Sequence, residues 1–149
     1  MVRVMAPSAD GKPATGRSEY VLVFDGGSHG NPGPAYGSFR IQCVGRPADA
    51  PERLTLGRGT NNEAEYKTLI AGLEALHGHI HAAGKALGDV EVEVRGDSLL
   101  VIEQLRGRWK VRDGRMRRLN EQAAELLSPF GRVRLVHQPR HASVRILGH

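Results

Sequence analysis

Three carboxylates stand in distinctive local sequences, each near the end of an expected helix or strand. Asp25 lies in VFDGGSHGNPGP, Glu65 in TNNEAEY and Asp97 in VEVRGDS. A cluster of hard oxygen ligands drawn from separate segments is what a protein needs to hold Mg²⁺ against a phosphate group. These residues therefore indicate metal-assisted phosphate chemistry, on the condition that the fold brings them together.

Asp25 and Asp97 each have a structural alternative. Asp25 precedes two glycines, and a turn aspartate that bonds its own backbone is the commoner residue in such a DGG sequence. Asp97 separates an expected strand from an expected helix, where a lone Asp is most often an N-cap. The ligand role gains weight for Asp97 if its strand neighbours the strand before Asp25, since both acids then lie at adjacent strand ends.

Glu65 must be distinguished from Glu63, because positions two apart on a helix point about 200° apart and cannot share a site. The sequence from Thr60 to Glu63 fits a capping box, in which the Thr side chain bonds the Glu63 amide and the Glu63 carboxylate bonds back to the cap. Glu65 is instead in register with Leu69 and Leu73, on the face that packs against the sheet. A carboxylate buried there is costly unless it is paired or binds a metal. We therefore expect Glu65 to be the ligand and Glu63 to be structural.

The apolar patterning predicts an α/β fold. The run at 20–24 is continuously apolar, as in a central strand, and VEVEV at 90–94 alternates, as in a strand with one apolar face. Three consecutive strands with short links indicate an antiparallel meander, so we expect a mixed five-stranded sheet of three antiparallel strands and two further strands, flanked by helices. The expected elements are strands at 20–24, 37–44 and 53–57, a helix at 62–77, a strand at 90–94, helices at 98–105 and 116–127, a strand at 133–137 and a short tail.

The composition suits one domain with a polyanionic partner. With 149 residues and 40% hydrophobic content, the chain can bury one sizeable core, and we expect a disordered N-terminal tail at 1–18 and a single domain at 19–149. The net charge of +5 favours nucleic acid as the partner. The single cysteine, Cys43, excludes an internal disulfide and fits a cytoplasmic protein. We expect no membrane association, because no apolar run is long enough for a span.

Three motifs together resemble type 1 ribonuclease H, in that family's order and spacing, from about residue 20 to residue 140. They are DGGSHGNPGPAYG, TNNEAEYKTLIAGLEAL and RGDSLLVIEQLRGRWKV. The resemblance implies an RNase H-like fold and a metal-dependent endoribonuclease that hydrolyses the RNA strand of an RNA–DNA hybrid, leaving 5′-phosphate and 3′-hydroxyl ends. It implies two Mg²⁺ ions, replaceable by Mn²⁺, held by Asp25, Glu65 and Asp97, with Asp25 as the bridge. It implies no obligate protein partner, and we expect a monomer.

The resemblance also implies substrate contacts. Asn31, Asn61 and Asn62 match family positions that meet the minor groove of the hybrid, where an amide can read base edges and the 2′-hydroxyl group. A turn role for Asn31 and a capping role for Asn61 are the alternatives. Gly26 and Gly27 would let the backbone approach the substrate closely.

The C-terminal segment departs from the family pattern. The family has an Arg-x-x-Asn segment and a later Ala-Asp pair that supplies a fourth acid, whereas PRHASVRILGH places Arg140 and Ser143 at the first positions and Ile146-Leu147 at the last pair. No acid follows Glu125. The fourth carboxylate is therefore missing, which favours an alternative function: a weak or inactive module that binds RNA–DNA hybrids. A related nuclease or integrase of the same fold is a third alternative, which the TNN and NPG sequences argue against.

Two histidines and a tryptophan complete the set of candidate residues. His141 and His149 could ligate a metal through a neutral imidazole nitrogen, but a solvated histidine is the commoner residue in a tail. His141 also lies where the family places a mobile histidine that assists product release. Trp109 lies where the family contacts the DNA strand or packs a short connector, and we favour packing because a lone Trp is more often a core anchor.

Overall fold

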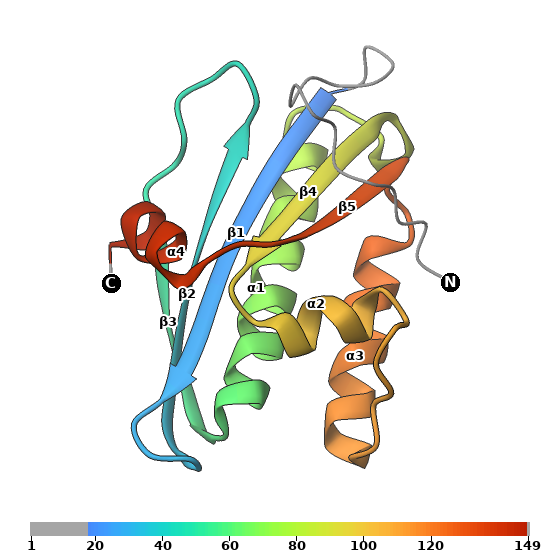
Figure 1. The fold of residues 1–149 in the computed structure, drawn as a ribbon. Helices are drawn as coiled ribbons and strands as arrows, with labels where there is room; N and C mark the ends of the chain where they lie inside the picture. Colours follow the sequence, from blue (N-terminus) through green and yellow to red (C-terminus); the bar gives the residue numbers. More distant parts are fainter. Residues whose placement is uncertain (1–17, 149) are drawn as a thin grey trace.

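The computed structural model describes residues 18–148. His149 and the expected tail, apart from Ser18, lie outside the described residues. The elements drawn in Figure 1 are β1 Ser18–Ser28, β2 Gly33–Cys43, β3 Glu52–Gly59, α1 Asn61–Ala82, a short 3-10 helix Leu87–Asp89, β4 Val90–Gly96, α2 Leu99–Leu105, α3 Gly114–Leu127, β5 Arg132–His137 and α4 Arg140–Leu147.

The five strands form one sheet in the order β3-β2-β1-β4-β5. β1 pairs antiparallel with β2, and β2 with β3, whereas β4 runs parallel to both β1 and β5. The expected mixed sheet, with an antiparallel part of three strands and two further strands, is confirmed. In Figure 1, α1 crosses behind the sheet and α4 lies in front of it, and both helices contact β1 and β2.

The main core lies between α1 and the sheet. Phe24 on β1 and Leu69 and Leu73 on α1 are fully buried, as their spacing predicts. The valines of β4 also face this core, but the other face of β4 is covered too, because Glu91 is 2% exposed and forms an ion pair with Arg132 at 3.7 Å. β4 is therefore buried on both faces, where the alternating pattern indicated one.

Side-chain caps define where α1 and α2 begin. The Glu63 amide donates to Thr60 Oγ1 at 3.1 Å, and the Thr60 amide donates to Glu63 Oε1 at 3.2 Å. This capping box confirms the structural role of Glu63. At α2, the Val101 amide donates to Ser98 Oγ at 3.3 Å. Ser98 is therefore the cap, and Asp97 does not fill that role.

Two expectations differ from the structure. The segment expected to be a short tail forms α4, whose Ser143 and Leu147 are fully buried. Trp109 is 45% exposed, so the interpretation of this residue as a core anchor is wrong.

Among residues 18–148, no helix combines the length and the apolar character needed to cross a membrane.

Candidate active site

The parallel pairing of β1 and β4 brings two of the three acids together. Phe24 pairs with Gly96, so Asp25 and Asp97 follow at the same edge of the sheet. Glu65 joins them from the second turn of α1. Oxygen atoms of the three carboxylates all lie within 4.8 Å of one another, which is the convergence that a shared metal site requires.

Gly26 allows α1 to come close enough for Glu65 to reach this edge. A Cβ atom at Gly26 would lie 2.5 Å from the carbonyl oxygen of Ala64, which no side chain tolerates without moving the helix. The Gly26 amide also hydrogen-bonds to the Glu65 carboxylate. The glycine after Asp25 therefore has a packing role between β1 and α1.

Burial and mutual repulsion disfavour the ionised form of the carboxylates in this cluster. Burial, followed by the charges of Asp25 and Asp97, raises the pKa of Glu65 to about 9. Burial and then Asp25 raise the pKa of Asp97 to about 6, while the nearby Arg140 and His137 oppose this rise. Like charges and low solvation both disfavour ionised carboxylates, and a divalent cation among them would reverse the effect.

Individual oxygen atoms also fit a metal ion. Glu65 Oε2 and Asp97 Oδ2 are buried and accept no hydrogen bond from residues 18–148. Asp97 Oδ2 has only the distant Arg140 Nη1, at 4.0 Å, as an ionic neighbour among these residues. Buried carboxylate oxygens that lack donors are costly, and hard oxygen ligands match Mg²⁺ or Mn²⁺. The donor set therefore fits the ions that the sequence indicated.

Glu65 and Asp97 line a cleft of about 510 Å³. Four of the expected substrate contacts line it: Gly26, Gly27, Asn61 and Asn62. The cleft also has polar lining residues that the sequence analysis did not assign to the site, namely Tyr36, Ser98, His137, Gln138 and Arg140.

Asn31 lies outside the residues that line the cleft, and it supports the start of α1. The Asn61 amide donates to Asn31 Oδ1 at 3.1 Å, and the Ser28 amide donates to Asn61 Oδ1 at 2.9 Å. These bonds tie the β1–β2 turn to α1, so Asn31 has the turn role that was its alternative. Asn61 does not have the capping role that was its alternative, because the cap of α1 is Thr60. The amide oxygens of both asparagines are occupied, and a substrate contact through the amide nitrogens stays a prediction.

His137 and Arg140 have positions that the sequence pattern could have indicated. His137 pairs with Gly96 at the end of the parallel strands β4 and β5, so it ends at the same edge as Asp97. Its Nε2 atom lies 3.2 Å from the Asp97 carbonyl oxygen. His141, by contrast, is exposed on α4 and is not among the residues that line the cleft. Its accessory role stays a prediction, as does that of His149, which lies outside the described residues.

Helix α4 contains no carboxylate at the positions where the resemblance implies a fourth acid. The helix has the sequence RHASVRIL and contains no carboxylate. Ser143, at the family's Asn position, is fully buried and accepts a hydrogen bond from Gln138 Nε2 at 2.9 Å. Leu147, which the resemblance matches to the position of the fourth acid, is fully buried. Among residues 18–148, the group that could hold a metal consists of Asp25, Glu65 and Asp97.

This sheet order, with one acid within β1, one directly after β4 and one on α1, defines the class of protein as one with an RNase H-like fold. A family model described as reverse transcriptase-like matches residues 41–145. A ribonuclease HI of Halobacterium salinarum is 41% identical over 122 residues, which are 82% of this chain and 57% of that protein. The chain belongs to the ribonuclease HI family.

Solved structures agree with this assignment. The RNase H1 of Halobacterium salinarum has a TM-score of 0.74 and 39% identity, covering 86% of this chain and 91% of that chain. An RNase H1 isolated from compost, solved in complex with an RNA/DNA hybrid, has a TM-score of 0.75 and 32% identity, covering 85% and 90%. The chain spans 57% of the length of the curated Halobacterium relative and 31% of three curated mycobacterial ones.

Proposed function

We propose that this chain is a metal-dependent endoribonuclease that hydrolyses the RNA strand of RNA–DNA hybrids and leaves 5′-phosphate and 3′-hydroxyl ends. The observation that carries the proposal is the approach of the Asp25, Glu65 and Asp97 carboxylates to within 4.8 Å of one another, at a cleft that Glu65 and Asp97 line. The hybrid bound to the compost relative supports the substrate class.

Asp25, Glu65 and Asp97 would hold two Mg²⁺ ions, with Mn²⁺ as a substitute. Bound ions of this kind lower the pKa of a coordinated water and neutralise charge that develops on the phosphate. Glu65 and Asp97 must lose their protons to serve as ligands, because the pKa of each is raised. Arg140, at 4.0 Å from Asp97 Oδ2, favours the ionised form of that carboxylate.

Asn61 and Asn62 would select the substrate. Both line the cleft beside Glu65, and their amide N–H groups can donate to base edges or to the 2′-hydroxyl that distinguishes RNA from DNA. The bond from the Ser28 amide orients the Asn61 side chain, so its amide nitrogen is held in one direction.

The first test is Asp97→Asn, assayed for cleavage of an end-labelled RNA–DNA hybrid in Mg²⁺, with double-stranded RNA as the substrate control. We expect cleavage to be abolished, because the variant keeps the shape of the side chain but loses its charge. Asp113→Asn is the matched control, since Asp113 caps α3 outside the cleft and Asn caps a helix as well as Asp does. Full cleavage by Asp97→Asn would contradict the proposal.

A second candidate function is a module that binds hybrids and cuts them weakly or not at all. The absence of a carboxylate from α4 favours it. Cleavage assays in Mg²⁺ and then in Mn²⁺, with a gel shift on the same hybrid, separate the two functions. Binding without product in either ion would support the module.

The monomeric state, the cytoplasmic location, the lack of an obligate protein partner and the division into a tail at 1–18 and a domain at 19–149 stay predictions from the sequence.

A further inference from the structure

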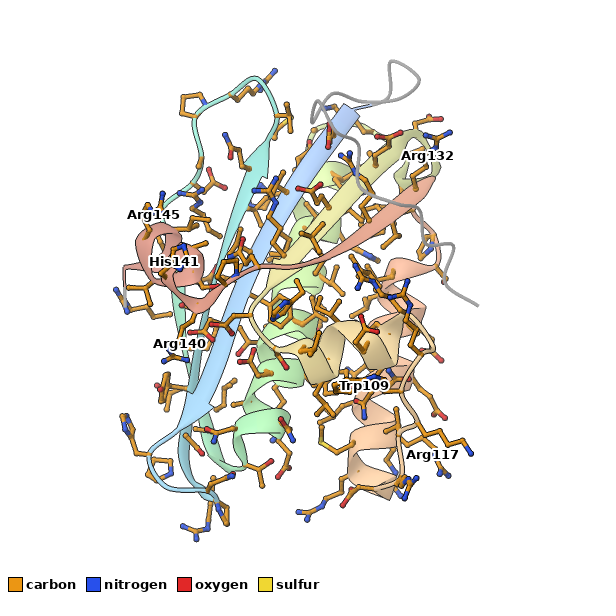
Figure 2. All side chains as sticks on the ribbon, viewed as in Figure 1. Trp109, Arg117, Arg132, Arg140, His141 and Arg145 are labelled. Atoms are coloured by element: carbon orange, nitrogen blue, oxygen red, sulfur yellow. The ribbon has the colours of Figure 1, made fainter. Side chains whose placement is uncertain are left out.

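The outer side of α4 carries positive charge beyond Arg140, the residue that faces Asp97. Arg140, His141 and Arg145 are exposed on this helix, and Figure 2 shows them following one another along it. Arg140 lines the cleft, so the series begins at the active site. His141 and Arg145 are four residues apart and therefore share one face of the helix.

Arg53 on the edge strand β3 extends this series. Asp25 pairs with Ser38, and Ser38 pairs with Arg53. Directly paired residues point to the same face of a sheet, so Arg53 stands on the Asp25 side. Its Nη2 atom lies 3.7 Å from the place that a Cβ atom on Gly148 would occupy, which puts it beside the end of α4. We call Arg53, Arg140, His141 and Arg145 the α4 basic strip.

Three residues of the strip have no ion-pair partner within the described part of the chain, whereas Arg140 faces Asp97 at 4.0 Å. The arginines of β5 pair with glutamates of the sheet, as Arg132 does with Glu91. Among residues 18–148, by contrast, Arg53, His141 and Arg145 take part in no ion pair. Glu52 is the nearest acid along β3, but successive residues of a strand point to opposite faces.

The spacing fits a nucleic acid that continues beyond the cleft. Arg53 is two strands away from Asp25, and neighbouring strands are about 4.8 Å apart, so the two backbones are about 10 Å apart. That is about three nucleotide steps along one strand of a duplex. Exposed arginines at such intervals suit the phosphate backbone, which they contact without reading sequence.

We propose that the α4 basic strip binds backbone phosphates of the hybrid about three nucleotides away from the cut site. This inference rests on the proposed function for the identity of the nucleic acid. Arg53 and Arg145 act as binding residues for the flanking duplex, and they leave the chemistry at Asp25 untouched.

The test is the salt dependence of binding, measured by fluorescence anisotropy of a labelled RNA–DNA hybrid in EDTA. For the double variant Arg53→Ala/Arg145→Ala, we expect the slope of log K against log salt to fall by about 2, because each lost phosphate contact removes about 0.9. In a cleavage assay, the KM for a long hybrid should rise while kcat is kept. With a hybrid so short that it fills only the cleft, the double variant and the wild type should have the same KM.

Two further variants control the test. Arg46→Ala removes one positive charge, against two in the double variant, from an exposed residue three positions after Cys43. Cys43 pairs with Tyr20 at the far end of β1 from Asp25, so this variant should leave the slope unchanged. Arg145→Lys keeps the charge and should keep the slope. A double variant whose slope matches that of Arg46→Ala would overturn the proposal and leave the strip as a solvated surface.

The outcomes separate this inference from the proposed function. If the wild-type protein cleaves hybrids and the double variant binds them like Arg46→Ala, only the strip is wrong. If the wild-type protein cuts no hybrid in Mg²⁺ or Mn²⁺ but the double variant still loses salt dependence, the strip is supported and the nuclease assignment fails.

Discussion

At the residue scale, Glu65 is the ligand with the strongest sequence signal, and it is also the carboxylate whose ionisation costs the most free energy. It is 7% exposed on the apolar face of α1, and burial beside two other acids raises its pKa to about 9 from 4.5. The folded chain therefore retains a proton that the unfolded chain loses above pH 4.5. Between pH 4.5 and 9, this difference lowers the stability of the metal-free fold as the pH rises.

Glu65→Gln should remove that loss of stability, because Gln resembles the protonated acid in shape and carries no proton to lose. At pH 8 in EDTA, we expect the variant to be more stable than the wild type by about 1–3 kcal/mol. Thermal unfolding followed by circular dichroism measures the difference. It should vanish near pH 4, where both states of the wild type are protonated. An equal difference at both pH values would contradict this account.

At the element scale, the contact between β1 and α1 positions the site. Gly26→Ala should place a methyl group 2.5 Å from the Ala64 carbonyl oxygen, so α1 must shift and carry Glu65 with it. We expect a destabilisation of about 1–3 kcal/mol together with a loss of hybrid cleavage, measured by urea unfolding and by the gel assay.

Gly78→Ala is the matched control on the same helix. A Cβ atom at Gly78 meets nothing within 4 Å, so the substitution should stabilise α1 by about 0.5–1 kcal/mol through helix propensity alone. If both variants changed stability by the same amount, close packing at Gly26 would not explain its effect.

The success of prediction from the sequence also differs between elements. The capping box at Thr60 and the apolar face of α1 are local patterns, and both were predicted correctly. α4 was missed because it has no side-chain cap and begins after Pro139. The helix is stabilised by the burial of Ser143 and Leu147 against the sheet, and this tertiary effect has no local sequence signal. Trp109 was misjudged because residue type alone does not reveal whether neighbouring elements cover a side chain.

At the scale of the whole molecule, the site is a product of sheet topology. Asp25 and Asp97 are far apart in sequence, and only the parallel pairing of β1 with β4 places them at one edge. The sequence correctly placed Asp97 after a strand, but the expected end of the first strand before Asp25 was wrong, because β1 continues to Ser28. The resemblance supplied the adjacency of the two acids. The pKa values of the cluster could not be predicted from the sequence, because they depend on the burial and the distances that the complete fold creates.

This dependence leads to a prediction for the whole protein: Mg²⁺ should stabilise the fold more at high pH than at low pH. A cation must displace the protons that Glu65 and Asp97 retain, with pKa values of about 9 and about 6, and this displacement costs less free energy as the pH rises. We expect the Mg²⁺-induced increase in Tm to grow between pH 6 and pH 9, as measured by differential scanning calorimetry. The increase should shrink in Asp97→Asn but not in Asp113→Asn. An increase in Tm that is independent of pH, or that is equal in both variants, would show that Mg²⁺ stabilises the protein away from the three carboxylates.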